Sequence, residues 1–156
     1  FYWIFGMPRT VSAQLSTTLN PKIPNDNAAL VLGYDGGLIA EVSCSFVCQA
    51  HETTTEVIAE HGTIIQKYGD GPSSKEGRPE SGPALKWYDA RRGKWAVGEP
   101  TGFVQWQRIQ NLAAPLADFL NGRRDAIATA EEGRDVLSII LSCYESHEDG
   151  RRVTLR

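Results

Sequence analysis

The sequence has no long hydrophobic run, few cysteines and no excess of basic charge, and each absence excludes a class of protein. None of its apolar stretches approaches the ~20 residues that a membrane-spanning helix needs. The apolar start, Phe1–Phe5, is short and follows no basic segment, which is not typical of a signal peptide. The net charge is -3, whereas a nucleic-acid-binding face is usually basic. We therefore expect neither a membrane nor a nucleic-acid partner.

The chain contains only three cysteines: Cys44, Cys48 and Cys143. An odd, sparse set does not make a disulfide framework. Cys44 and Cys48 fall in one predicted strand, where a rise of about 3.3 Å per residue separates their Cα atoms by roughly 13 Å, too far for a disulfide. We expect all three to be buried, reduced thiols, which favours a cytoplasmic protein.

The composition is that of an ordinary globular domain. A length of 156 residues suits one domain, and the hydrophobic and charged fractions of 41% and 22% are typical of soluble proteins. The chain begins with Phe1 rather than Met, so we expect it to be part of a longer protein.

The first two thirds of the chain predict β-strands. Val11, Ala13 and Leu15 alternate with polar residues, as in a strand with one buried face. Asp35 and the two glycines after it stand between two apolar runs, which is a strong hairpin signal. Strands are predicted over 11–16, 28–34, 38–47, 53–60, 63–67, 85–88, 94–97 and 152–156. Sequential strands joined by short turns favour an antiparallel sheet. The interruption over 68–84 is rich in Gly and Pro and predicts a long loop.

The last third predicts two helices. The first has helically spaced apolar residues, a break before Pro115 and an end at Asn121–Gly122. The second begins at Thr129, which forms a capping box with Glu132, and ends near Asp149–Gly150. Its apolar residues are predicted to share one side: Val136, Leu137, Ile140, Leu141 and Tyr144.

Strands followed by helices indicate an α+β fold, with an open, mostly antiparallel sheet and helices packed on one face. We expect one domain over residues 1–156. The other sheet face carries mixed residues, which hints at a subunit interface or at contact with a further domain.

No catalytic constellation is found in the sequence. The glycines at 69 and 71 lack the third glycine and the helix of a dinucleotide fingerprint. His51-Glu52 begins like a zinc-protease motif, but Thr55 stands where the second histidine is required. His61 and His147 are not spaced for a shared metal site, and a structural or surface role is simpler for all three histidines. The sequence therefore predicts no catalytic, cofactor-binding or metal-binding residue.

An ordered series of short motifs resembles the C-terminal domain of the Gfo/Idh/MocA (glucose–fructose oxidoreductase / inositol dehydrogenase) oxidoreductase family. Each motif is weak alone, but their order and spacing match over nearly the whole chain. The segments that carry the resemblance are 6–13 (GMPRTVSA), 26–27 with 34–37 (DN, YDGG), 56–64 (EVIAEHGTI), 116–120 (LADFL), 128–133 (ATAEEG), 144–146 (YES) and 150–153 (GRRV).

The resemblance implies a domain of the glyceraldehyde-phosphate-dehydrogenase-like type, whose open sheet mediates homo-oligomerisation and whose rim shapes a pocket for a sugar, polyol or related small molecule. It also implies an N-terminal Rossmann domain that binds NAD or NADP, outside this chain. The family's Glu-Lys-Pro and D-x-x-x-H catalytic motifs do not occur here. One segment that often reaches the substrate pocket in the family can be matched to this chain. This match makes His51, Glu52 and Thr54 candidate substrate-binding residues.

Three functions remain open. The first is a substrate-pocket and oligomerisation domain of an NAD(P)-dependent oxidoreductase, inactive alone. The second is a non-catalytic interaction or scaffold module that uses the open sheet face. A small hydrolase using His51 and Glu52 is the weakest, because no nucleophile or metal constellation supports it.

Overall fold

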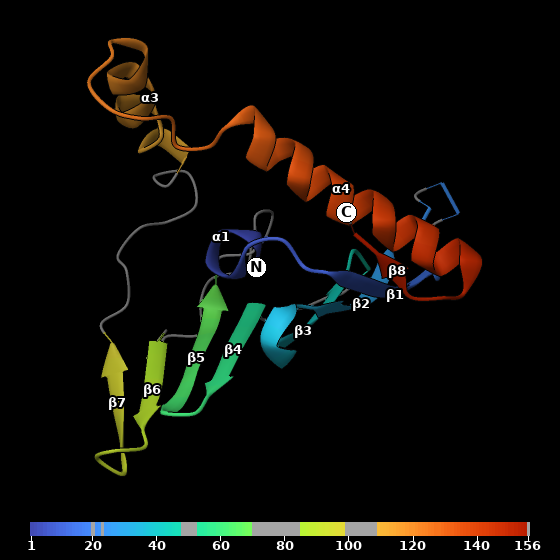
Figure 1. Ribbon diagram of the computed structural model, residues 1–156, viewed down its shortest axis with the longest axis horizontal. Helices are drawn as coiled ribbons and strands as arrows, with labels where there is room; N and C mark the ends of the chain where they lie inside the picture. Colours follow the sequence, from blue (N-terminus) through green and yellow to red (C-terminus); the bar gives the residue numbers. More distant parts are fainter. Residues whose placement is uncertain (20, 23, 48–52, 70–84, 99–108, 156) are drawn as a thin grey trace. The chain divides into compact units, whose positions relative to one another are not determined.

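The computed structural model describes residues 1–155 apart from 20, 23, 48–52, 70–84 and 99–108. The chain divides into two compact units: Phe1–Cys48 with Ala126–Arg156, and Gln49–Asp125. Both contain antiparallel sheets, and the helices among the described residues lie in short turns of the first 40 residues and in the C-terminal third, so the predicted α+β class is confirmed (Figure 1).

The first unit is a four-stranded sheet covered by one long helix. Its strands occur in the order β3-β2-β1-β8 and are all antiparallel. The elements of this unit are α1 (Tyr2–Phe5), β1 (Thr10–Ser16), β2 (Asn27–Gly33), the 3-10 turn η1 (Asp35–Gly37), β3 (Ile39–Ser45), α4 (Ala130–Asp149) and β8 (Val153–Thr154). All the strands predicted here are present, within a few residues of their expected ends.

The predicted hairpin joins β2 to β3. Gly36 and Gly37 have φ angles of 74° and 86°, which side-chain-bearing residues rarely adopt. The Asp35 carboxylate accepts a hydrogen bond from Arg9 Nε at 2.7 Å. The turn therefore depends on its glycines, as the sequence pattern predicts.

The core lies between the sheet and α4, which crosses β1 and β8 (Figure 1). Alternate residues of the strands point to the helix, while their neighbours face the other way. The buried cluster consists of Val11, Ala13, Leu32, Ala40, Ile139, Cys143 and Leu155.

The apolar side predicted for the second helix is not its packing face. Ile139, Cys143 and Ser146 are buried against the sheet, whereas the five residues predicted to share a side are 39–59% exposed. Both sets have helical spacing, so periodicity alone cannot choose between them.

Polar contacts at the two ends of α4 set its rotation. Near its start, Asp135 accepts a hydrogen bond from the Tyr2 hydroxyl at 3.0 Å. Hydrogen bonds from Arg134 and then Tyr2 lower the pKa of Asp135, and the bond to Asp135 raises the pKa of Tyr2. Near its end, Ser146 bonds to the backbone of Ala13 in β1. These contacts turn Ile139 and Cys143 inward.

The predicted capping box starts α4. Thr129 Oγ1 accepts a hydrogen bond from the Glu132 backbone N–H at 3.1 Å, and the Thr129 N–H donates to Glu132 Oε2 at 2.7 Å. Gly150 ends the helix in the left-handed conformation. Among the described residues, no helix is both long enough and apolar enough to cross a membrane.

We expect Thr129→Ala to lower the free energy of unfolding by about 1 kcal/mol, because the backbone N–H of Glu132 loses the hydroxyl to which it donates. Thr129→Ser keeps the hydroxyl and should stay within a few tenths of a kcal/mol of the wild type. Urea denaturation followed by the helical circular dichroism signal measures both. Equal stability of the alanine and serine variants would contradict this role.

The cysteine prediction is partly wrong. Cys143 is buried and burial raises the pKa of its thiol, but Cys44 is exposed. Cys44 lies on β3, two strands away from β1, which α4 covers. Cys48 lies outside the described residues.

The second unit is a separate antiparallel sheet in the order β4-β5-β6-β7. Tyr88 and Trp95 pair across β6 and β7 with ring centroids 5.5 Å apart, and Lys86 Nζ lies 4.7 Å from the centre of the Trp95 ring. The strands are β4 (Thr53–Ala59), β5 (Gly62–Gly69), β6 (Leu85–Asp89) and β7 (Lys94–Gly98). The loop predicted over 68–84 begins later, since β5 continues to Gly69; the rest of it lies outside the described residues.

The helix of the second unit, α3 (Ala113–Leu120), shows how its proline is tolerated. Pro115 is the third helical residue, where its missing N–H has no intrahelical partner to lose. The Asn121 side chain donates to the Ala117 carbonyl at 2.7 Å, and Gly122 follows with a φ of 68°. The predicted break and the predicted end are both present. The part of this helical pattern up to residue 108 lies outside the described residues.

Candidate functional site

Of the three substrate-binding residues predicted from the sequence, only Thr54 falls in the described part of the chain. Thr54 is exposed on β4. His51 and Glu52 lie outside the described residues, so their role stays a prediction.

A hollow of about 540 Å³ is present in the first unit, on the sheet and beside the end of α4. Its polar lining comes from three strands and from the segment that follows the helix. The residues that line it are Ser12, Ala13, Gln14, Ala29, Leu30, Val31, Glu41, Val42, Ser43, Ser146, Gly150, Arg151 and Arg152. Ser12, Val31 and Glu41 alternate with the buried core residues, which places them on the sheet face opposite α4. We call this the open face of the β3-β2-β1-β8 sheet.

The strand register aligns the main residues of the open face in one row. Ser12 is paired with Val31, and Val31 is paired with Glu41. Thr10 and Val11 are paired with Thr154 and Val153, and the pairing of β1 with β8 ends there. We call Ser12, Val31 and Glu41 the cross-strand row.

The end of α4 replaces β8 as the partner of β1 beyond Val11. Ser146 is 2% exposed; its hydroxyl accepts the Ala13 N–H at 3.0 Å and donates to the Arg151 carbonyl at 2.7 Å. His147 Nδ1 accepts the Leu15 N–H at 3.3 Å. Two side chains of the helix thus take over ladder hydrogen bonds that a longer β8 would supply.

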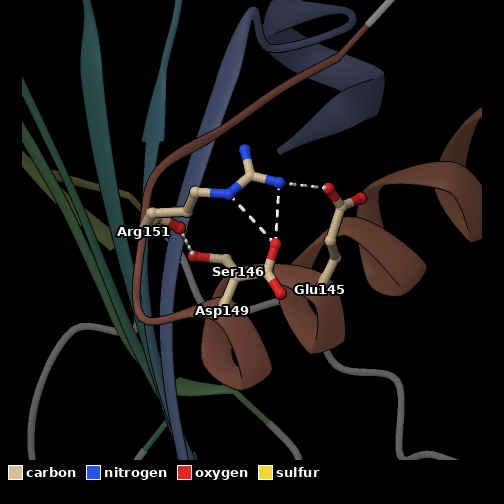
Figure 2. Close-up of polar contacts among 4 residues, drawn as sticks. All are labelled: Glu145, Ser146, Asp149 and Arg151. Carbon is tan, nitrogen blue, oxygen red and sulfur yellow. Dashed lines mark hydrogen bonds and ion pairs between the residues drawn. The ribbon is translucent and has the colours of Figure 1, made fainter.

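Arg151 holds the segment after α4 against the helix (Figure 2). Its guanidinium donates to Asp149 Oδ2 at 3.0 and 2.7 Å and to Glu145 Oε1 at 3.2 Å. Its carbonyl accepts the Ser146 bond drawn in the same view. All three charged side chains are well exposed, so we expect the pairs to order the segment rather than to add much stability. The effect is to place the neighbouring Arg152 at the hollow.

The lining of the hollow includes groups that can form hydrogen bonds and ion pairs. Ser146 is not available as a nucleophile, because both its hydrogen bonds are made within the protein. Within the described ranges, no three His, Cys, Asp or Glu side chains gather in an arrangement that could hold a metal ion. Hydroxyl, amide, carboxylate and guanidinium groups line the hollow together with apolar side chains. The sequence predicts that this face is mixed in polarity, but its residues can be aligned only once the strand register is known.

The family model that matches the chain is the GFO/IDH/MocA C-terminal domain, over residues 1–65. This confirms the resemblance predicted from the motifs. No curated protein sequence matches the chain significantly.

Solved structures share the fold over almost the whole chain. The yvaA protein of Bacillus subtilis, provisionally described as an oxidoreductase, is 21% identical with a TM-score of 0.76, over 99% of this chain and 48% of its own. The WlbA dehydrogenase of Bordetella pertussis, solved with NADH and UDP-GlcNAcA, is 18% identical with a TM-score of 0.69, over 99% and 41%. The aldose-aldose oxidoreductase of Caulobacter crescentus, solved with glycerol, is 19% identical with a TM-score of 0.74, over 99% and 43%. The chain spans less than half the length of each.

Proposed function

We propose that this chain, whose residues 1–65 match the GFO/IDH/MocA C-terminal domain, is the substrate-pocket and oligomerisation domain of an NAD(P)-dependent oxidoreductase. The observation that carries the proposal is the shared fold over 99% of the chain with oxidoreductases more than twice its length. In this proposal the Rossmann domain, the NAD or NADP site and the catalytic groups belong to the rest of the protein.

The proposed substrate is a sugar, polyol or related molecule. Two of the structural neighbours were solved with a nucleotide sugar or with glycerol, both rich in hydroxyl groups. His51 would exchange hydrogen bonds with substrate hydroxyls, since an imidazole both donates and accepts. Glu52 would accept from them, and Thr54, exposed on β4, would do either.

The proposed assembly is a homo-oligomer formed through the open face of the first unit. Mixed polar and apolar side chains, including a Val31 that is 43% exposed, suit a subunit contact of ordinary polarity. A cytoplasmic location fits this proposal, since Cys44 and Cys143 are both free thiols.

Calorimetric titration of the 156-residue chain with NAD+ and with NADP+ tests whether the nucleotide-binding site belongs to the rest of the protein. We expect no saturable heat up to about 1 mM of either nucleotide, because the chain carries no dinucleotide fingerprint. The matched control is the same titration of the product of the whole coding sequence, which should bind one nucleotide. Micromolar binding by the 156-residue chain would overturn the proposal.

The scaffold-module alternative is favoured by the lack of catalytic motifs in this sequence. The two functions differ in what is encoded upstream. A preceding segment of about 150–200 residues that contains G-x-G-x-x-G supports the enzyme, and its absence from the coding sequence supports the module.

A further inference from the structure

The hollow on the open face has two neighbouring rows of side chains along its floor. The cross-strand row is one of them. The next row on the same face is paired across the same three strands and consists of Gln14, Ala29 and Ser43. In both rows the apolar residue lies on the middle strand, β2, and the polar residues lie on β1 and β3. The hollow therefore has an apolar centre with polar groups on both sides.

Glu41 and Arg152 give the hollow charges of opposite sign. Glu41 is exposed on β3, and Arg152 is exposed directly before β8, the strand at the other edge of the sheet. Two interstrand steps of about 4.8 Å place roughly 10 Å of sheet between Glu41 and β1. In the part of the chain that the structure describes, neither charge forms an ion pair, although Arg151 forms two. Both charges are therefore available to a ligand.

The backbone around Arg152 is held in place on both sides. On one side, Ser146 bonds to the Arg151 carbonyl, and the Arg151 guanidinium is paired with two carboxylates of α4 (Figure 2). On the other side, Val153 is paired with Val11 of β1. The base is thus positioned without a ligand, which lowers the entropy that binding would cost.

This arrangement fits a small zwitterion better than a simple anion or cation. The guanidinium of Arg152 can bind a carboxylate through two hydrogen bonds, and the carboxylate of Glu41 can accept hydrogen bonds from an ammonium group. A simple anion would satisfy the base but leave the acid unpaired, and a simple cation would do the reverse. The volume of about 540 Å³ lies within the range of small-molecule sites.

The separation of the two charges indicates how long the zwitterion is. In a single α-amino acid the ammonium and the carboxylate are attached to one carbon, so both cannot reach opposite sides of the hollow. A dipeptide separates them by a peptide group. That group could exchange hydrogen bonds with the polar side chains of the floor: Ser12, Gln14 and Ser43.

We propose that the hollow of the open face is a binding site for a short peptide zwitterion, a dipeptide in the simplest case, with the ligand carboxylate on Arg152 and its ammonium on Glu41. None of the residues that line this site is among the substrate-binding residues proposed above. The inference goes beyond the proposed function, because it depends on neither the nucleotide nor the rest of the protein.

Titration of the isotope-labelled 156-residue chain with alanyl-alanine, followed by amide chemical shifts, tests the site. We expect saturable shifts at the residues of the two rows, with a Kd on the order of 1 mM. N-acetyl-alanyl-alanine lacks the ammonium and alanyl-alanine amide lacks the carboxylate, so each should bind at least about tenfold more weakly. The titrations use a protein concentration at which sedimentation velocity shows one species, so that self-association does not contribute to the shifts.

Two variants assign the ends of the ligand. Glu41→Gln and Arg152→Gln should each raise the Kd of alanyl-alanine by at least about tenfold. Glu41→Gln should also abolish the preference over the N-acetylated probe, and Arg152→Gln should abolish the preference over the amide, because each removes the charge that the probe lacks a partner for. Matched controls are Glu148→Gln and Arg91→Gln; both residues are exposed, neither lines the hollow, and neither variant should change the Kd.

Circular dichroism at 222 nm checks that every variant is folded. The absence of saturable shifts up to about 50 mM alanyl-alanine would overturn the proposal. Equal affinity for the three probes, or shifts confined to residues outside the hollow, would overturn it as well. Binding that the two charge variants leave unchanged would show that the ligand is held elsewhere.

Discussion

Leu32→Ala is expected to lower the free energy of unfolding by about 2–5 kcal/mol, because it leaves a cavity in the centre of the first unit. Leu32 is 3% exposed and lies on β2, the inner strand between β1 and β3. Its neighbours include Val11, which is fully buried, and Ala40 across the β2–β3 ladder. Because Leu32 is packed within the buried cluster of this unit, its surroundings have little room to collapse around the missing atoms.

Urea denaturation followed at 222 nm measures this loss, since α4 supplies most of the helix in the described residues. The matched control is Leu141→Ala, on the outward side of α4, where the leucine is 59% exposed. Its loss should stay below about 1 kcal/mol. If the two variants were equally destabilised, the helix face assigned here as buried would be wrong.

Ser146→Ala is expected to lower the free energy of unfolding by about 1–3 kcal/mol, although it removes one oxygen atom. The substitution leaves the Ala13 N–H and the Arg151 carbonyl without their partner, at a position that is 2% exposed. An unsatisfied buried polar group loses its solvation without gaining a hydrogen bond. Hydrogen exchange of the Ala13 amide should become faster, which a purely local loss of packing would not require.

Ser142→Ala is the control for this prediction. Ser142 lies one turn earlier on α4, is half-buried, and its hydroxyl makes no hydrogen bond within the described residues. We expect its stability to change by less than about 0.5 kcal/mol. Unchanged Ala13 exchange in Ser146→Ala would show that water, and not Ser146, satisfies the edge of β1.

Ser146 also makes a contact that the sequence does not predict. The motif that contains it, Tyr144-Glu145-Ser146, contributed to the resemblance, but nothing in it indicates a bond to residue 13. That contact spans 133 positions of sequence and forms because β8 is only two residues long, so the rest of β1 needs other partners. Short-range sequence patterns do not indicate that side chains of a helix will take the place of a strand as hydrogen-bond partners of β1.

The sequence by itself determined the elements of this protein and their local chemistry. Alternation predicted the strands, Asp35 with its glycines predicted the hairpin, and Thr129 with Glu132 predicted the start of α4. Each of these features depends on residues a few positions apart, so the cause lies in the local sequence.

Only the tertiary structure decided which side of each element is covered. Helical spacing offered two apolar sides of α4, and bonds from Tyr2 and Ala13, both far away in the chain, selected one of them. Strand register likewise aligned Ser12, Val31 and Glu41 across three strands. Rotation and register are set by contacts between distant segments, because the local free energy of a helix or a strand is nearly the same whichever side it turns inward.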